Sequence, residues 1–353
     1  MNILVLNGSP AGQNSITLQT VIYIQQFYDQ YHFDVLDVGQ RIKQYEKDFS
    51  ECKEKIKAAD LILFTYPVYT FLIPAQLHRF IELMKEADID YSKKYASQIT
   101  TSKHFYDVTA HRYIQDNCDD MGLMYIKGLS ADMEDLLSKK GQHEALAFFR
   151  YVQWSYQRGY HEPVLYAEKK EFNGIEPAIP EREVLPKRGK IAIVTDTTED
   201  SPLYRMIQRF QYKTSFETVV VNLKEFPFSG GCLGCFHCAS TGKCIYKDGF
   251  DAYLRNNIQT TDATVYAFSI KDHGMGYRFK LYDDRQFCNG HRTVTMGKPV
   301  GYLIDGNLDE EPNLRMVIEA RADTGGNYLA GIAQTKVIRI RKLTGWQIRY
   351  SMR

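Results

Sequence analysis

The pattern of expected strands and helices occurs twice along the chain, and this repeat constrains the fold more than any other feature. Short apolar runs alternate with segments whose apolar residues recur at helical spacing. The expected strands are residues 2–6, 33–38, 61–66, 98–102 and 123–127, then 190–195, 217–223, 263–270, 299–304 and 328–333. Strands that alternate with helices predict a parallel sheet covered on both faces. We therefore expect two tandem, doubly wound α/β domains, each with a five-stranded parallel sheet.

A segment of loop composition separates the two halves of the pattern. It contains Pro163, Pro177, Pro180 and Pro186 among residues of mixed charge, which is typical of a linker. At the end of the chain, apolar and basic residues alternate around Leu343-Thr344-Gly345, which predicts a basic hairpin. The expected divisions are a first domain over 1–160, a linker over 161–188, a second domain over 189–335 and the hairpin tail over 336–353.

Composition excludes several classes of partner. The 353 residues include 44 Lys and Arg against 43 Asp and Glu, so the chain lacks the charge that binds nucleic acid or an anionic membrane. Its apolar runs are too short for a membrane span, and Met1 leads into an apolar run without a basic leader. We expect a cytoplasmic protein that binds neither nucleic acid nor membrane.

Four of the seven cysteines lie in one short segment, GCLGCFHCASTGKC. Cys232, Cys235, Cys238 and Cys244 follow the spacing C-x2-C-x2-C-x5-C, which gathers four soft thiolates around one small volume and predicts a [4Fe-4S] cluster. Structural zinc usually takes two C-x2-C pairs separated by a dozen or more residues, but zinc and a redox dithiol remain alternatives. The other three cysteines have no such spacing and are expected to be ordinary buried thiols: Cys52, Cys118 and Cys288.

The loop after the first expected strand has the composition of a phosphate site. Residues 7–17, NGSPAGQNSIT, carry hydroxyl and amide side chains but no carboxylate, and they lead into a helix. Backbone N–H groups, the helix dipole and the hydroxyls of Ser9, Ser15 and Thr17 can together hold a phosphate. The alternative is that Ser15 only caps the helix.

A second loop lies at the same edge of the expected sheet. Residues 67–71, PVYTF, follow the third strand, and Pro74 stands near the start of the next helix. Because the carboxyl ends of parallel strands meet at one edge, residues 67–71 and 7–17 should lie together, where open α/β sheets bind ligands.

The pair NGSPxGxNSxT and YPVYTFLIPAQLHRFIE resembles the flavodoxin-like NAD(P)H-dependent FMN reductase family. The resemblance implies that the first loop holds the FMN phosphate, that residues 67–71 support the isoalloxazine ring, and that the loop after the fourth strand edges the ring. His104 is a candidate hydrogen-bond donor to the flavin, although a loop histidine is more often only solvated. The implied FMN site comprises Ser9, Pro10, Asn14, Ser15, Thr17, Pro67, Val68, Tyr69, Thr70, Phe71, Ser102, Lys103, His104, Phe105 and Tyr106.

The second half lacks these features at the corresponding places. Its first loop, residues 195–202, contains Asp196, Glu199 and Asp200, whose charges would repel a phosphate. After its third strand, residues 271–277 (KDHGMGY) replace the PVY-type loop and are expected to be flexible. A second FMN is therefore not expected.

The cysteine spacing, followed by Tyr246-Lys247-Asp248, resembles the iron-sulfur flavoproteins within that family. In those proteins one polypeptide carries both FMN and a four-iron cluster, and a dimer brings cluster and flavin together. The resemblance implies that this one chain imitates such a dimer, with FMN on residues 1–160 and the cluster on residues 189–335.

The function that follows is an iron-sulfur flavoprotein oxidoreductase. It would pass electrons from NAD(P)H or ferredoxin through FMN and the [4Fe-4S] cluster to a small-molecule or protein acceptor, with a homodimer as a possible assembly. No side chain is assigned a catalytic role, because the two cofactors carry the chemistry. The alternatives are a non-catalytic electron carrier or redox sensor, and a plain FMN reductase with structural zinc at the cysteine loop.

Overall fold

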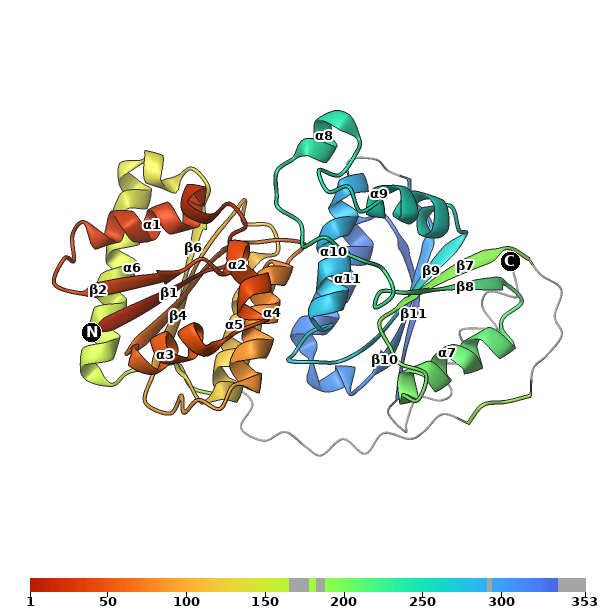
Figure 1. The fold of residues 1–353 in the computed structure, drawn as a ribbon, viewed down its shortest axis with the longest axis horizontal. Coiled ribbons are helices and arrows are strands. Elements are labelled where there is room, and N and C mark those ends of the chain that lie inside the picture. The colour runs from red at the N-terminus through yellow and green to blue at the C-terminus, as the bar shows by residue number, and fades with distance from the viewer. Residues whose placement is uncertain (165–177, 182–187, 291–293, 336–353) are drawn as a thin grey trace. The chain divides into compact units, whose positions relative to one another are not determined.

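The structure is a computed structural model that describes residues 1–164, 178–181, 188–290 and 294–335 (Figure 1). The chain divides into two compact units. The first is Met1–Glu168 together with Cys232–Gly234, and the second is Lys169–Gly231 together with Cys235–Arg353. The expected hairpin tail lies outside the described residues, as does most of the expected linker.

The first unit contains one parallel sheet. Its strands follow the order β2-β1-β3-β4-β5, and β6 also pairs with β4. This is the doubly wound order of flavodoxin-like folds. The strands are β1 (Asn2–Asn7), β2 (His32–Leu36), β3 (Leu61–Pro67), β4 (Tyr95–Ser102), β5 (Met124–Tyr125) and β6 (Leu129–Asp132).

The fifth strand position differs from the expected single strand over 123–127. Two short strands, β5 and β6, share the outer edge of β4. Between them the chain passes so close to β4 that a Cβ on Gly128 would lie 2.6 Å from the carbonyl oxygen of Gln98. The buried Gln98 amide donates at this point to the carbonyl oxygen of His111, 3.0 Å away. The ladder along β4 is interrupted between its pairing with β5 and its pairing with β6.

Helices cover both faces of the first sheet (Figure 1). Alternate residues of β1 and β3, such as Val5 and Leu63, form one core with Val21 and Phe149 from two of these helices. None of the helices in the described part of the chain combines the length and the apolar character that a membrane span requires. The helices are α1 (Ile16–Gln25), α2 (Val38–Tyr45), α3 (Ser50–Ala58), α4 (Ala75–Glu86), α5 (Asp107–Met121) and α6 (Lys139–Arg158), with 3₁₀ turns at Gly12–Asn14 and Asp135–Leu137.

The second unit repeats the same topology. Its order is β11-β10-β9-β7-β8, with every pair parallel, so the first strand again lies between the second and the third. The strands are β7 (Lys190–Thr195), β8 (Glu217–Asn222), β9 (Ala263–Ser269), β10 (Pro299–Asp305) and β11 (Tyr328–Gln334). The predicted fold class, two doubly wound α/β sheets, is confirmed.

The helices of the second unit are shorter on the side that carries the cysteine loop. In the core of the second unit, β7 and β9 pack against one long helix through Ile193, Val265 and Ile207. The helical segments are α7 (Pro202–Lys213), α8 (His237–Thr241), α9 (Phe250–Tyr253), a π turn η3 (Leu254–Gln259), α10 (Tyr277–Arg285), the 3₁₀ turns η4 (Gln286–Asn289) and η5 (Leu308–Glu310), and α11 (Pro312–Thr324).

Candidate functional site

The loop between β1 and α1 is curled by its own hydrogen bonds. Asn7 donates to the carbonyl oxygen of Gly12 at 3.1 Å and to Asp37 Oδ1 at 2.9 Å, and it accepts from the Ser9 N–H at 3.3 Å. Ser9 Oγ in turn accepts from the backbone N–H of Ala11 at 3.3 Å. The loop therefore has a defined shape at the carboxyl end of β1.

The hydroxyls expected to hold phosphate lie at the start of α1. Ser15 caps the helix, because its Oγ accepts from the Leu18 N–H at 3.4 Å. A hydroxyl that accepts in this way still has its own O–H to donate, so capping and phosphate binding are compatible for both Ser9 and Ser15. Thr17 Oγ1 lies 2.7 Å from Thr101 Oγ1 of β4, which joins the helix start to the sheet edge.

The loop after β3 is a tight two-residue turn. Tyr69 and Leu72 exchange backbone hydrogen bonds of 2.8 and 2.9 Å, which enclose Thr70 at φ 44° and Phe71 at φ 69°. Left-handed backbone is costly for such residues and is concentrated at functional sites. The Val68 N–H donates to the Thr101 carbonyl oxygen at 3.2 Å, so this turn and the start of α1 both contact β4 at Thr101.

Aromatic side chains connect this turn to the loop after β4. The ring of Phe71 lies 5.8 Å from that of Phe105 and 4.9 Å from that of Tyr106, both edge to face. Thr109 Oγ1 donates to the carbonyl oxygens of Phe71 and Tyr106. The structure thus places the expected flavin-ring loops, residues 67–71 and 102–106, against each other.

His104 belongs to a polar cluster that the sequence did not reveal. Its Nδ1 lies 3.1 Å from Asp107 Oδ2 and 3.3 Å from Ser130 Oγ, and its backbone N–H donates to Ser102 Oγ at 2.9 Å. Burial raises the pKa of Asp107, but hydrogen bonds from Ser130, His104 and Ser102 outweigh burial, so its pKa lies below the ordinary value. The ionised carboxylate fixes the imidazole with a proton on Nδ1. The sequence feature that could have revealed this cluster is Asp107, a carboxylate three residues after His104.

Lys103 is held apart from this cluster. Its ammonium group pairs with Asp132 at 3.0 Å and with Glu134 at 3.2 Å, and its side chain is 57% exposed. The hydrogen bonds that these carboxylates accept raise the pKa of Lys103. Lys103 therefore lies on a solvated, carboxylate-rich part of the site.

The corresponding turn in the second unit is ordered, contrary to the expectation of a flexible loop. Lys271 and Gly274 exchange backbone hydrogen bonds of 3.0 and 2.9 Å around Asp272 at φ 51° and His273 at φ 61°. His273 Nδ1 lies 2.8 Å from Glu311 Oε2. The backbone of the two-residue turn is thus common to both units, although the side chains differ.

The acidic loop of the second unit has local hydrogen bonds that correspond to those of the loop between β1 and α1. Thr195 Oγ1 accepts from the Thr197 N–H at 3.2 Å, and Ser201 caps α7 by accepting from the Tyr204 N–H at 3.1 Å. Glu199 and Asp200 are exposed at its tip. Their charges oppose phosphate binding at this loop.

The cysteine loop connects β8 to α9 and contains α8. Cys235 is exposed, and Cys232, Cys238 and Cys244 are half-buried. The Gly234 N–H donates to Cys232 Sγ at 3.5 Å, and burial together with the charges of Cys235 and Cys244 raises the pKa of Cys238. Over residues 1–164, 178–181, 188–290 and 294–335, however, no three His, Cys, Asp or Glu side chains are arranged to hold a metal ion. The cysteine sulfur atoms are chemically suitable ligands for an iron-sulfur cluster. In the described part of the chain, however, they are not positioned together as a set of metal ligands.

Both ends of the cysteine loop are joined by a buried arginine. Arg285 donates to the carbonyl oxygen of Gly230 at 2.7 Å and makes a two-pronged pair with Asp248 at 2.8 and 3.0 Å. The side chains of Arg285 and Asp248 are 1% and 3% exposed, and the guanidinium lies 4.5 Å from the centre of the Tyr246 ring. Burial alone would raise the pKa of Asp248, yet the Arg285 hydrogen bonds lower it. We call Arg285 and Asp248 the loop clasp.

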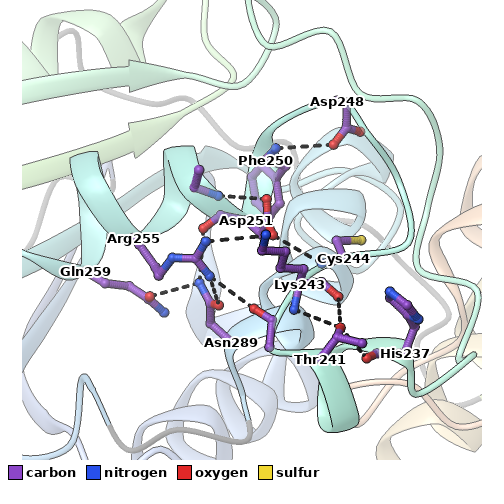
Figure 2. A network of polar contacts seen from close by, with 12 residues as sticks. His237, Thr241, Lys243, Cys244, Asp248, Phe250, Asp251, Arg255, Gln259 and Asn289 are labelled. Atoms are coloured by element: carbon purple, nitrogen blue, oxygen red, sulfur yellow. Dashed lines mark hydrogen bonds and ion pairs between the residues drawn. The ribbon is translucent and has the colours of Figure 1, made fainter.

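A polar network fixes the carboxyl end of the same loop (Figure 2). Asp251 Oδ2 accepts from the Cys244 N–H at 3.2 Å. Arg255 donates to the Gly242 carbonyl oxygen at 3.3 Å and to Asn289 Oδ1 at 3.2 Å. Asn289, the last residue of the turn η4, therefore connects this turn to the cysteine loop through Arg255.

The strand order and the two loops at the carboxyl edge define the first unit as a flavodoxin-like α/β domain. Residues 1–116 match the NADPH-dependent FMN reductase family. The match supports FMN as the cofactor of this unit and NAD(P)H-dependent flavin reduction as its chemistry. A comparison with curated proteins gives no match.

Several solved structures are similar to this chain at low identity. Smu.1420 from Streptococcus mutans is 16% identical with a TM-score of 0.35, over 44% of this chain and 100% of its own. An FMN-dependent NADH-azoreductase from Bacillus anthracis in complex with FMN is 13% identical with a TM-score of 0.34, over 45% and 99%. An NAD(P)H:quinone oxidoreductase from Methanothermobacter marburgensis is 14% identical with a TM-score of 0.34, over 46% and 96%. These values carry no assignment of activity to this chain.

Proposed function

We propose that the protein is an NAD(P)H-dependent flavin oxidoreductase with FMN on its first unit and a [4Fe-4S] cluster on the cysteine loop of its second. One observation carries the flavin half of the proposal. The phosphate-type loop and the turn after β3 both contact Thr101, through Thr17 Oγ1 at 2.7 Å and the Val68 N–H at 3.2 Å. Two loops far apart in sequence thus meet at the edge where such sheets bind ligands.

The residues of the first loop fit an FMN phosphate. Ser9 and Ser15 present hydroxyl donors, and the loop bears no carboxylate of its own. The N-terminus of α1 adds backbone N–H groups and a positive dipole end. Asn14 and Thr17 complete the expected phosphate site, and Pro10 shapes the loop. The sites remain predictions at the level of single residues.

Residues 67–71 and 102–106 would hold the flavin ring. When bound, FMN would supply the ability to accept two electrons as a hydride and to pass them on one at a time. The edge-to-face rings of Phe71, Phe105 and Tyr106 would exclude water from one side of it. His104 would present Nε2 at the ring edge, where the neutral ring accepts a hydrogen bond and the protonated ring donates one, in an orientation that the 3.1 Å contact with Asp107 fixes.

The cluster half of the proposal depends on donor chemistry. Cys232, Cys235, Cys238 and Cys244 would be the ligands, since their spacing suits a compact four-thiolate site. The Gly234 N–H already donates to a cysteine sulfur, as backbone groups do around such clusters. The cluster would pass electrons one at a time. The loop clasp would hold the two ends of the loop together while metal is bound.

The remaining expectations belong to the same proposal. Ferredoxin is a second candidate donor beside NAD(P)H, and the acceptor is a small molecule or a protein. The domains would extend over residues 1–160 and 189–335, with a homodimer as one possible assembly. A cytoplasmic location suits the free thiols of the cysteine loop.

A plain FMN reductase is a second candidate. It is favoured by the lack of a metal-ligand set among the residues that the structure describes. In that case the cysteine loop would hold zinc or no metal, and only the first unit would be redox-active.

Turnover with NADPH tests whether the protein is an enzyme. Under anaerobic conditions, excess NADPH and a quinone should bleach and reoxidise the flavin through many cycles. A single stoichiometric reduction without turnover would instead identify an electron carrier or redox sensor. Reduced ferredoxin in place of NADPH shows which donor the flavin accepts.

A further inference from the structure

The start of α2 packs closely against the candidate phosphate loop. Gly39, in the first turn of this helix, is buried. A Cβ on Gly39 would lie 2.3 Å from both the carbonyl carbon and the carbonyl oxygen of Ser9, and 2.7 Å from the nitrogen of Pro10. These are backbone atoms, which cannot rotate aside as the end of a flexible side chain can. Only glycine allows the helix and the loop to approach so closely.

The Ser9 carbonyl group is part of the turn that shapes the loop. It accepts from the Gly12 N–H at 3.1 Å, and the Ser9 hydroxyl accepts from the Ala11 N–H at 3.3 Å. Displacement of this carbonyl group would open the turn and move the Ser9 hydroxyl, one of the proposed phosphate donors. The position of that hydroxyl therefore depends on the contact with Gly39.

Asp37, which precedes α2, holds the same loop through Asn7. Its carboxylate accepts from Asn7 Nδ2 at 2.9 Å and from Gln13 Nε2 at 3.2 Å. The Asn7 amide in turn donates to the Gly12 carbonyl oxygen and accepts from the Ser9 N–H. A carboxylate near a phosphate site opposes anion binding, so Asp37 contributes through its hydrogen bond to Asn7 and not through its charge.

The second unit has different residues at these two positions. Counted from the pairing of the first two strands in each unit, the position of Gly39 is occupied by Lys224, which is exposed. The position of Asp37 is occupied by Asn222, whose Nδ2 donates to the Thr197 carbonyl oxygen at 3.4 Å. The buried glycine thus accompanies the carboxylate-free loop and is replaced where the loop is acidic.

We propose, given the FMN site of the proposed function, that Gly39 and Asp37 are positioning residues for the FMN phosphate and make the first unit prefer FMN to riboflavin. Gly39 seats Ser9 against α2, and Asp37 holds Asn7, so the loop is ordered before the anion binds. An ordered loop pays less entropy on binding and therefore binds more tightly. Riboflavin has the same ring and ribityl chain but no phosphate, so its binding should not depend on the shape of this loop.

Binding of FMN and of riboflavin to the full-length protein, from which flavin has been removed, tests the proposal. Quenching of flavin fluorescence gives both dissociation constants. Gly39→Ala and Asp37→Ala should each raise the Kd for FMN by about tenfold, the effect of one lost hydrogen bond to a charged group, and leave the Kd for riboflavin unchanged. An equal loss of affinity for both flavins, or no loss for FMN, would overturn the proposal.

Gly141→Ala is the matched control for a steric clash elsewhere in the first unit. A Cβ on Gly141, in α6, would lie 2.2 Å from the carbonyl oxygen of Asp135, which is also a backbone atom. Gly141→Ala should lower the unfolding midpoint, as Gly39→Ala does, but leave the Kd for FMN unchanged. A similar rise in the Kd for FMN in both variants would show that lost stability is the cause and would contradict the proposal.

Asp37→Asn separates the hydrogen bond from the charge. Its amide oxygen can still accept from Asn7, and the negative charge is removed, so FMN should bind at least as tightly as to the wild type. Equal losses of FMN affinity in Asp37→Asn and Asp37→Ala would contradict a role through Asn7.

The wild type distinguishes failure of this proposal from failure of the FMN site. Wild-type protein that binds FMN no more tightly than riboflavin would contradict the phosphate site itself, and the positioning role with it. Wild-type protein that prefers FMN, together with Gly39→Ala and Asp37→Ala variants that keep this preference, would overturn the positioning role alone.

Discussion

At the residue scale, the loop clasp shows how one side chain can organise a long loop. Arg285 reaches the carbonyl oxygen before the first cysteine and the carboxylate after the last one. Its charge is buried, paired with the Asp248 carboxylate through both terminal nitrogens and packed on the Tyr246 ring. Removing one partner of a buried ion pair leaves the other charge buried without a counter-ion, and this destabilises the folded protein strongly.

Replacement of the arginine should therefore destabilise the second unit. Arg285→Ala leaves Asp248 buried without its cation, and we expect the free energy of unfolding to fall by about 3 kcal/mol. Urea denaturation measures the change. The control is Arg315→Ala, which removes a partly exposed pair with Asp309 in the same unit and should cost less than about 1 kcal/mol. Equal effects of the two variants would contradict the role of the clasp.

Asp107 allows a test of the His104 orientation. Asp107→Asn keeps the shape of the side chain but removes the charge that fixes the imidazole proton on Nδ1. We expect the rate of flavin reduction by NADPH to fall about tenfold and its pH profile to shift, with FMN content unchanged. The control is Asp132→Asn, which weakens the pair with Lys103 and the hydrogen bond from the Glu134 N–H but leaves Asp107 in place. An unchanged rate and pH profile would exclude His104 from the reaction.

His111 predicts a pH dependence of stability. Its Nε2 lies 2.8 Å from Thr100 Oγ1, and burial lowers its pKa from 6.5 to about 4. As pH falls from about 6.5 to about 4, the unfolded chain binds a proton that the folded chain excludes, so stability is lost over this range. His111→Gln should flatten the fall in unfolding midpoint between pH 7 and pH 5. The same substitution at exposed His143 should leave the slope as in the wild type.

At the element scale, α1 allows helix capping to be separated from the proposed phosphate binding. Ser15→Ala removes the cap and a hydroxyl of the proposed phosphate site, so we expect a loss of about 1 kcal/mol in stability and weaker FMN binding. Ser138→Ala removes an equivalent cap from α6, where Ser138 Oγ accepts from the Gly141 N–H at 3.0 Å. Its stability loss should be similar, with FMN affinity unchanged. Equal FMN affinities in both variants, measured by flavin fluorescence, would exclude Ser15 from the phosphate site.

Periodicity in the sequence predicted most of the strands, because buried parallel strands are short apolar runs. It failed at residues 123–127, where two short strands take the place of one and Gly128 between them passes close to Gln98. It also failed at residues 271–277, where a glycine-rich composition suggested flexibility but two backbone bonds close a turn. The first error arises from a close approach to another strand and the second from backbone hydrogen bonds within the loop itself, and composition alone contains neither.

At the scale of the whole molecule, the two units share a strand order and differ in their loops. The first has a carboxylate-free phosphate-type loop, and the second has an acidic loop in that position and, after its second strand, a segment with Cys235, Cys238 and Cys244. The repeat and the cysteine spacing were visible in the sequence. Asp107 and Arg285 were not assigned, because no motif marks their contacts, whereas Cys288 was expected to be an ordinary buried thiol and is buried. Single-residue assignments for FMN and cluster remain predictions.

The division of cofactors between the two units is tested most directly by one measurement: iron, sulfide, zinc and FMN content of the full-length protein purified without oxygen. We predict about four iron atoms, about four sulfides and about one FMN per chain, and a Cys235→Ser variant that loses iron but keeps its flavin. Wild-type protein that retains FMN and holds zinc or no metal would contradict the cluster. Protein without flavin after reconstitution would contradict the account of the first unit.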